Sequence, residues 1–211
     1  DPVNNQIGIL HIPRDMHFTP FGTTDFLRVN TLMLEGENLQ EGYGPEFARE
    51  TIQYNMGMYV DNYVAVDFQA FEFWIDAIGG VEITTPFTID DPTYPDMNYG
   101  LDPFYLPAGT HTLDGHAALQ YARTRHGDND FVRGLRQLQV IEAVFERVTS
   151  DNMLPYLIGI APTLLDELGR NIYTDLRLPD MIQLAQFAVT VPPENITGDT
   201  INLSHNMVYT L

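Results

Sequence analysis

A strand, a capped helix and a second strand follow one another directly in this chain, and this succession constrains the fold most. Asn62–Val66 (NYVAV) reads as a buried strand, and Asp67 can cap the helix that follows over Phe68–Ile78. The glycine pair at 79–80 ends that helix, and Val81–Thr84 (VEIT) reads as another short strand. The alternation predicts a layered α/β or α+β fold.

Weaker signals continue the pattern along the chain. A stripe of apolar residues at 3-4-3 spacing, Leu138, Ile141, Phe145 and Val148, predicts a helix whose stripe faces the core. The proline-rich segment 85–112 is expected to be a long connection without regular structure. Helices are expected at 45–56, 116–122, 131–149, 153–168 and 179–190, and strands at 6–12, 201–203 and 207–209.

Composition excludes several classes of protein. The 211 residues suit a single domain, and no apolar run reaches the length of about 18 residues that a membrane-spanning helix needs. A net charge of -19 argues against binding to nucleic acid, because neutralising phosphates requires a basic face. The absence of cysteine excludes disulfides, zinc-thiolate sites and cysteine nucleophiles.

Four arginines crowd into the segment Tyr121–Gln139 of this acidic, lysine-free chain: Arg123, Arg125, Arg133 and Arg136. Cations packed this closely repel one another, so an anionic group is expected to offset them. The planar fork of arginine suits bidentate contact with phosphate or carboxylate. The first hypothesis is therefore a phosphate site.

The spacing of these residues predicts a geometry for the site. In extended backbone, Arg123 and Arg125 point to the same side, about 7 Å apart along the strand. Asp130 stands just before a helix, where it can accept the free N–H groups of the first turn. Arg133 and Gln137 are four residues apart and share a helix face. These side chains could clamp a pyrophosphate at the helix N-terminus.

A structural interpretation competes with the phosphate site. Asp128, Asp130 and Glu142 are close enough in sequence to neutralise the arginines in an ion-pair network. The pair Arg14 and Asp15, which follows the first strand, is a second candidate, because ligands often bind at strand ends in α/β folds. Its alternative is an ordinary turn with a salt bridge.

Several blocks together resemble the LytR-CpsA-Psr family. They are HIPRDMHF at 11–18, RVN at 28–30, VDFQAFEFWIDAIGGVEI at 66–83, LDGHAALQYARTRHGDNDFVRGLRQLQVI at 113–141 and TDLRLPDMIQLAQFA at 174–188. The resemblance covers nearly the whole chain, and the arginine segment is its most specific part. The order of the blocks strengthens the match.

The resemblance implies a three-layer α-β-α fold, with a central mixed β-sheet flanked by helices and an apolar tunnel for a lipid tail. It implies a single domain over residues 1–211 that lacks the family's first strands and its upstream N-terminal membrane anchor. The implied enzyme is a phosphotransferase of cell wall biogenesis on the extracytoplasmic face of the cell membrane. It moves a glycopolymer, such as teichoic acid or capsular polysaccharide, from a polyprenyl-pyrophosphate carrier to peptidoglycan.

The family's motifs also imply roles for individual residues. The arginines are expected to bind the pyrophosphate and to offset charge in the transition state. Asp130 is expected either to orient the arginines or to help activate the acceptor hydroxyl. The residues that match the family's motifs are Arg14, Arg123, Arg125, Asp130, Arg133 and Gln137.

Members of the family hold Mg²⁺ with aspartates on strands upstream of the first residue here. No metal ligand is therefore assigned within the chain, Asp15 included, and the fragment alone is expected to be inactive or to need another chain to complete its sheet. Two other functions stay open. One is a non-catalytic envelope module that binds lipid phosphate or anionic polysaccharide through the same arginines. The other is a pyrophosphate hydrolase.

Overall fold

The structure, a computed structural model, describes residues 1–96, 98–124, 130–150, 153, 155–160, 162 and 171–201. Its helices are α1 (Leu32–Leu39), α2 (Gly44–Met56), α3 (Phe68–Ala77), α4 (Gly115–Arg123), α5 (Asp130–Ser150) and α7 (Leu178–Ala188). Its strands are β1 (Ile7–His11), β2 (His17–Phe18), β3 (Leu27–Arg28), β4 (Val64–Val66), β5 (Val81–Thr85), β6 (Ile89–Asp91), β7 (Phe104–Leu106), β8 (Gly109–Leu113), β9 (Ile172–Thr174) and β10 (Ile196–Thr200). Short 3-10 turns cover Val29–Thr31 and Pro193–Asn195.

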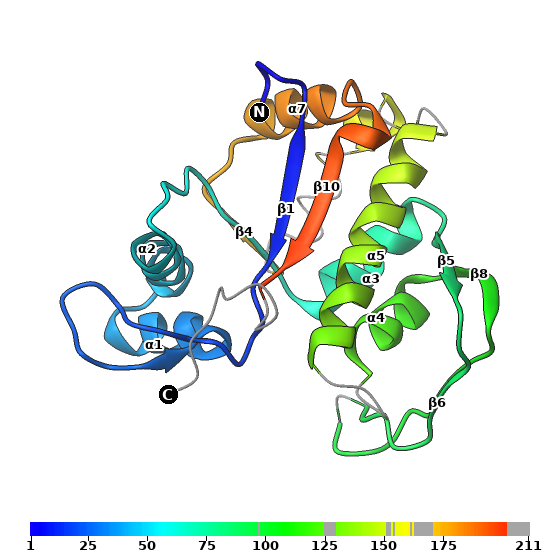
Figure 1. The fold of residues 1–211 in the computed structure, drawn as a ribbon, viewed down its shortest axis with the longest axis horizontal. Coiled ribbons are helices and arrows are strands. Elements are labelled where there is room, and N and C mark those ends of the chain that lie inside the picture. The colour runs from blue at the N-terminus through cyan, green and yellow to red at the C-terminus, as the bar shows by residue number, and fades with distance from the viewer. Residues whose placement is uncertain are drawn as a thin grey trace.

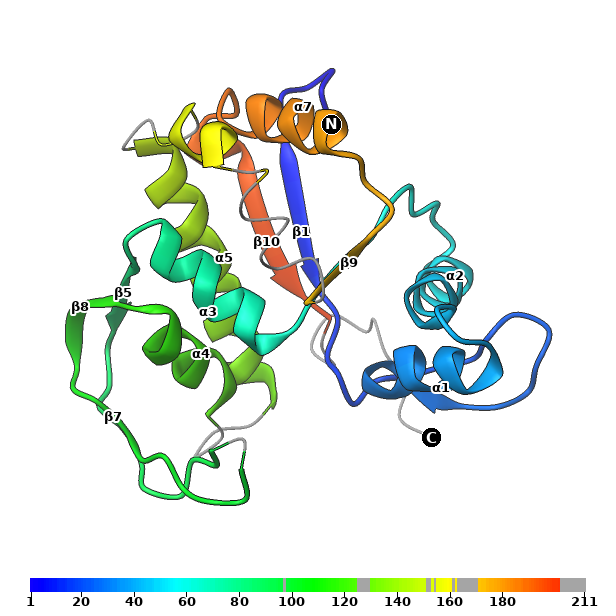
Figure 2. The ribbon, with the colours of Figure 1, turned by 180° about the vertical axis from the view of Figure 1, so that it is seen from behind.

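Helices lie on both sides of the strands β1, β10 and β4, as Figures 1 and 2 show. The pair α1 and α2 lies on one side, and α5, backed by α3 and α4, lies on the other. This arrangement confirms the mixed α/β class. Over the described residues, however, the strands form two-stranded pairs rather than one continuous sheet: β1–β10 is parallel, and β2–β3, β4–β9, β5–β8 and β6–β7 are antiparallel.

The strand, capped helix and second strand predicted from the sequence are all present. The side chain of Asp67 accepts a hydrogen bond from the Ala70 amide at 2.8 Å, which caps α3. Gly79 and Gly80 have φ values of 78° and 87°, a conformation that glycine adopts without strain, and they end the helix. These signals are local in sequence, and for that reason they could be read without the fold.

The expectation that β4 is a buried strand is wrong. Val64 is 49% exposed and Val66 is 44% exposed. Among the described residues β4 pairs only with β9, and the side of the strand that carries these two valines is not covered. The apolar tunnel implied by the family resemblance is not seen and stays a prediction.

The main hydrophobic core lies away from these strands, between α3, α4, α5 and the antiparallel strand pairs β5–β8 and β6–β7. Strand β5 contributes Val81 and Ile83, which are fully buried, while Leu113 on β8 and Val140 on α5 close the core from two sides. The alternating burial of β5 matches the period of two expected for a strand with one covered face. This core holds α3, α4 and α5 as one unit.

Other elements were predicted with mixed success. Strand β1 and helices α2, α4 and α7 are confirmed close to their expected bounds. Strands β6, β7 and β8 overturn the reading of 85–112 as irregular, because strands of three to five residues broken by prolines carry little pattern of their own. Strand β10, over 196–200, was not predicted. The segment expected as a helix at 153–168 is helical at 155–160 and 162, and half of it lies outside the described residues, as do nearly all of 201–203 and 207–209.

Helix α5 is confirmed, but its apolar stripe is placed differently from the expectation. Leu138 is buried against β10, whereas Ile141 is 47% exposed, and Val140 and Ala143 face the main core instead. The helix lies between β1–β10 on one side and β5 with α4 on the other, so its buried surface covers two faces. Within the part of the chain that the structure describes, no helix is long and apolar enough to cross a membrane.

Candidate functional site

The close packing of α4 on α3 positions the first of the predicted site residues. Asp114 accepts a hydrogen bond from the Ala117 amide at 2.8 Å and caps α4. Gly115 then meets α3 so closely that a Cβ atom at this position would lie 2.1 Å from the Glu72 carbonyl oxygen. The contact holds α4 against α3, and Arg123, the last residue of α4, lies over the start of α3.

Arg123 is held between two aromatic rings. Its guanidinium carbon lies 4.1 Å from the ring centroid of Phe68 and 5.6 Å from that of Tyr94. Its Nη1 also donates a hydrogen bond to the Tyr94 hydroxyl at 3.0 Å. Burial raises the pKa of the Tyr94 phenol, although the charge of Arg123 opposes the shift. The neutral phenol and the Phe68 ring thus orient a permanent cation.

Helix α5 supplies Arg133, which is buried, and Gln137 one turn further on. The Gln137 amide Nε2 donates to the Ala122 carbonyl on α4 at 3.2 Å, so Oε1 is the acceptor. His11 therefore donates from Nε2 to that oxygen at 2.9 Å, and its Nδ1 accepts from the Thr200 hydroxyl at 2.6 Å. These bonds fix α5 to α4 and to the β1–β10 pair.

Four of the predicted site residues line one pocket of about 530 Å³: Arg14, Arg123, Arg133 and Gln137. They come from the turn after β1, the end of α4 and the first turns of α5. Residues far apart in sequence therefore meet at one surface. The rest of the lining comes from the start of α3 and the segment after β6: Phe68, Asp91, Thr93, Tyr94, Pro95 and Thr124.

The position of Arg14 agrees with both interpretations made from the sequence, a turn with a salt bridge and a residue of a binding site. Its side chain is 52% exposed and its Nε lies 3.8 Å from Asp15 Oδ1, which is a loose ion pair of the kind that contributes little stability. The same side chain lines the arginine pocket. Its backbone is held by a hydrogen bond from the Asn30 amide at 3.0 Å. The guanidinium is thus accessible at the pocket, on a turn whose backbone is fixed.

The expected extended geometry of the arginine pair is wrong for Arg123. That residue is helical, and the chain leaves the helix only at Thr124, whose φ and ψ are -54° and 143°. Arg125 falls in 125–129, outside the described residues. Asp130 is the first residue of α5, and its side chain also lies outside the description. The predicted roles of both residues stay predictions.

Sequence reasoning missed six lining residues: Phe68, Asp91, Thr93, Tyr94, Pro95 and Thr124. Asp91 is 5% exposed, and both of its carboxylate oxygens accept hydrogen bonds. Its Oδ1 accepts from Thr93 Oγ1 at 3.0 Å, and its Oδ2 accepts from Thr124 Oγ1 at 2.6 Å. One available signal was the position of Thr124 between two arginines. No local pattern marks Phe68 or Tyr94.

The pocket has the chemistry of an anion site. Guanidinium groups stay charged at any physiological pH, and their planar forks match phosphate oxygens. The N-terminal end of α5 adds the positive end of a helix dipole. Metal binding fits less well, because the described residues contain no group of three or more acidic or histidine side chains arranged to hold an ion. They do not supply a ligand set for the expected Mg²⁺.

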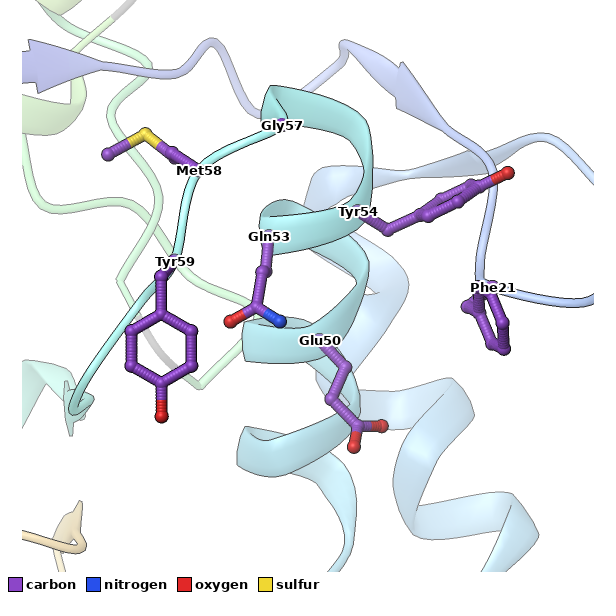
Figure 3. Close-up of a pocket in the computed structure, with 7 residues that line it drawn as sticks. All are labelled: Phe21, Glu50, Gln53, Tyr54, Gly57, Met58 and Tyr59. Atoms are coloured by element: carbon purple, nitrogen blue, oxygen red, sulfur yellow. The ribbon is translucent and has the colours of Figure 1, made fainter.

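A second pocket, of about 580 Å³, lies on α2 and the segment after it and has a different character. Figure 3 shows Tyr54 and Phe21 on one side of the helix and Met58 and Tyr59 on the other. Phe21 and Tyr59 are 78% and 71% exposed. The lining includes Glu50 but no arginine, and none of the predicted site residues, so its charge does not suit an anion. The arginine pocket is the candidate functional site.

The chain is similar in sequence to two named transferases of Bacillus subtilis. TagV of Bacillus subtilis (strain 168), named as a polyisoprenyl-teichoic acid–peptidoglycan teichoic acid transferase, is 28% identical over 99% of the chain and 52% of its own length. TagT of the same organism, named as the same kind of transferase, is 32% identical over 70% of the chain and 44% of its own length. The chain thus spans about half the length of these relatives.

Solved structures share the fold. The crystal structure of B. subtilis TagV superposes with a TM-score of 0.74 and 26% identity, over 96% of this chain and 73% of that one. TagT bound to LI-WTA superposes with a TM-score of 0.67 and 25% identity, over 95% and 68% of the two chains. The model of the LytR_cpsA_psr family matches residues 1–211. The chain belongs to the LytR_cpsA_psr family.

Proposed function

We propose that the arginine pocket binds the pyrophosphate of a polyprenyl-pyrophosphate-linked glycan, and that the longer protein transfers this glycopolymer to peptidoglycan. The observation that carries the proposal is the convergence of Arg14, Arg123 and Arg133 on one pocket from three separate elements. The names of TagV and TagT, which give teichoic acid and peptidoglycan as substrates, support the same class of reaction.

The reaction consists of an attack by an acceptor hydroxyl on the phosphorus that bears the glycan. The new phosphorus–oxygen bond forms as the bond to the bridging oxygen breaks, and polyprenyl phosphate leaves. Negative charge grows on the leaving oxygens, and guanidinium groups already in place stabilise it without reorganisation. Arg123 is suited to this work because Phe68 and Tyr94 hold its plane before the ligand arrives.

The acceptor hydroxyl must lose a proton, and Asp91 is the carboxylate that lines the pocket. Its two oxygens already accept hydrogen bonds from Thr93 and Thr124, so we do not assign it as the base. Asp130, at the start of α5, is the residue that we propose orients the arginines or accepts this proton. Arg125 joins the clamp in the same proposal. Mg²⁺ is proposed for the longer protein only.

The proposal places the longer protein on the extracytoplasmic face of the cell membrane, held by an N-terminal membrane anchor. Teichoic acid and peptidoglycan, the substrates in the names of TagV and TagT, belong to the cell envelope, and this supports the location. A polyprenyl carrier resides in a membrane, so an enzyme that uses it must work at the membrane surface. The wider set of polymers, capsular polysaccharide included, remains part of the proposal.

The test uses the longer natural protein, a polyprenyl-pyrophosphate-linked glycan, a peptidoglycan acceptor and Mg²⁺, with release of polyprenyl phosphate as the readout. Arg123→Ala and Arg125→Ala are expected to lose about 10- to 100-fold in substrate affinity, the effect of removing one charge-assisted contact, and more in turnover. Arg177→Ala, on an exposed arginine at the start of α7, is the matched control. Unchanged turnover in both site variants would sink the proposal.

A second candidate is a module that binds lipid phosphate or anionic polysaccharide without catalysis. The hydrogen bonds that occupy both Asp91 oxygens favour it, because they make this lining carboxylate poorly suited to accept a proton. The same assay separates the two functions. Tight binding of the polyprenyl-pyrophosphate-linked glycan without release of polyprenyl phosphate, with the acceptor present, would indicate the module. Release of glycan phosphate to water when no acceptor is present would indicate a hydrolase.

A further inference from the structure

Thr124 stands between Arg123 and Arg125 in sequence and is only 1% exposed. Each of its polar groups is bound by a different part of the fold. Its amide donates to the Gln120 carbonyl on α4 at 2.8 Å, its hydroxyl donates to Asp91 Oδ2 at 2.6 Å, and its carbonyl accepts from Arg136 Nη2 at 2.6 Å. The residue that separates the two arginines is therefore anchored to α4, to the end of β6 and to α5.

Asp91 also links Thr124 to Tyr94, the tyrosine that contacts Arg123. It is the last residue of β6, and its carbonyl accepts a hydrogen bond from the Tyr94 amide at 3.3 Å. Its Oδ1 accepts from the Thr93 amide and hydroxyl at 3.2 and 3.0 Å. The turn that carries Tyr94 is thus folded around the same carboxylate that binds Thr124. Asp91 therefore helps to fix both partners of the Tyr94–Arg123 contact, Tyr94 through its turn and Arg123 through the neighbouring Thr124.

Arg136 completes the anchor from α5. It is 5% exposed, and its guanidinium carbon lies 5.7 Å from the ring centroid of Tyr121. Burying a guanidinium costs free energy that an apolar side chain would not, so stability alone is a poor reason for an arginine here. Its fork instead fixes the Thr124 carbonyl, at the peptide that leads toward Arg125. We therefore assign Arg136 the role of orienting the Thr124 backbone rather than that of enlarging the core.

We propose that Asp91, Thr124 and Arg136 form a buried positioning network that sets the direction of Arg123 for pyrophosphate binding. The inference rests on the proposed function of the pocket and extends it to residues that do not touch the ligand themselves. Thr124 fixes the backbone directly after Arg123, and Asp91 fixes the turn that carries Tyr94, whose hydroxyl accepts a hydrogen bond from Arg123. Pre-aimed guanidinium groups lose less conformational entropy when the anion binds.

The test compares side chains at position 124 that differ mainly in the hydroxyl. Thr124→Val keeps the shape and removes the bond to Asp91, whereas Thr124→Ser keeps the hydroxyl. Farnesyl pyrophosphate is titrated calorimetrically into each variant at fixed low salt. Thr124→Val is expected to bind about tenfold more weakly, the effect of one hydrogen bond to a charged group, and Thr124→Ser to bind like the wild type.

A purely structural role would change stability without changing the affinity of the folded protein. Thermal unfolding is therefore measured for each variant, and affinities are compared below the transition. Thr110→Val is the matched control, because Thr110 makes a hydroxyl–hydroxyl contact of 2.8 Å with Thr84 on the exposed face of the β5–β8 pair. If Thr124→Val does not fold, Thr124→Ala and Thr124→Ser form a second pair that differs in the hydroxyl and adds no volume.

The outcomes separate this inference from the proposed function. If Arg123→Ala loses binding while folded Thr124→Val, or Thr124→Ala in the second pair, binds like the wild type, the positioning network is overturned and the pyrophosphate site stands. If Arg123→Ala itself binds like the wild type, the proposed function fails. Weaker binding by Thr124→Val together with rescue by Thr124→Ser supports the network. Equal weakening in both variants would point to packing and contradict it.

Discussion

The guanidinium of Arg123 lies 4.1 Å above the ring of Phe68, a residue from a different helix and more than fifty positions earlier in the chain. Phe68 is 42% exposed, so its other surface is open to solvent while this contact is kept. An aromatic face beneath a guanidinium attracts the cation and leaves its edge, where the N–H donors lie, free to point at an anion.

Replacing Phe68 is therefore expected to weaken pyrophosphate binding. Phe68→Leu retains an apolar side chain but removes the ring face, and we expect farnesyl pyrophosphate to bind about two- to thirtyfold more weakly, as for loss of a cation–π contact. Phe68→Tyr should bind like the wild type. The control is Phe87→Leu, at a residue that is 76% exposed. Wild-type affinity in Phe68→Leu would show that the ring does not orient Arg123.

The Phe68–Arg123 contact depends in turn on how closely α3 and α4 approach at Gly115. A methyl group there would lie 2.1 Å from the Glu72 carbonyl oxygen, so Gly115→Ala must push the helices apart. We expect a loss of about 1–3 kcal/mol in the free energy of unfolding, or more, measured by urea denaturation. Gly8→Ala is the matched control, because a Cβ atom at Gly8 meets nothing within 4 Å. Equal stability of the two variants would contradict this account of the packing.

Local signals allowed much of this helix pair to be predicted. Asp67 and Asp114 each stand one residue before a helix, and both cap it through a side-chain oxygen. Such caps involve residues three positions apart, so they can be read from the sequence. The end of α4 could not be placed as well. Including Arg123 in the helix turns its side chain away from the extended geometry that the spacing with Arg125 had indicated.

Long-range contacts set the limits of prediction at the site. Tyr94 meets Arg123 across 29 positions of sequence, from an irregular segment between two three-residue strands. Nothing local distinguishes this tyrosine from its neighbours. Arg14 reaches the pocket only because β1 packs beside α5, and its role was implied by family resemblance rather than by spacing. The exposed valines of β4 show the same limit, because burial depends on neighbours that the strand itself does not specify.

His116 gives a pH dependence that can be tested. It is on the α4 face turned toward Glu72 and Asp102, and its ring nitrogens lie 3.0 and 2.8 Å from their carboxylate oxygens. Partial burial opposes the charged imidazole, but the bonds to Glu72 and Asp102 outweigh it and raise the pKa of His116 above its ordinary value of 6.5. The folded state therefore binds the proton more tightly than the unfolded chain does.

The sign follows from this difference in proton affinity. The stabilisation by His116 is full below the unfolded pKa, near 6.5, and is lost as the pH rises through the higher pKa of the folded state. The stabilities of wild type and His116→Gln in urea denaturation should differ most below pH 6.5 and converge as the pH rises above the folded-state pKa. An NMR titration of the His116 ring should give a midpoint above the ordinary value. A midpoint below it would contradict the predicted direction.

Arg14 and Arg177 offer a charge-matched test of which exposed arginine belongs to the site. Each is paired with a nearby carboxylate, Arg14 with Asp15 at 3.8 Å and Arg177 with Asp180 at 2.9 Å, and both side chains are more than half exposed. Removing either one changes the net charge of this acidic chain equally. Any general effect of charge on an anionic ligand must therefore be the same in Arg14→Ala and Arg177→Ala.

Of these two arginines, Arg14 lines the arginine pocket and Arg177 does not. Arg14→Ala is therefore expected to weaken binding of farnesyl pyrophosphate by about tenfold at low salt, and Arg177→Ala is not. The slope of log affinity against log salt should also fall in Arg14→Ala and stay unchanged in Arg177→Ala, since a direct ionic contact with phosphate is lost only in the former. Equal affinities and equal slopes in the two variants would show that the Arg14–Asp15 pair is an ordinary turn with an exposed salt bridge and not part of the binding site. A selective loss in Arg14→Ala would place the pyrophosphate between β1 and the end of α4.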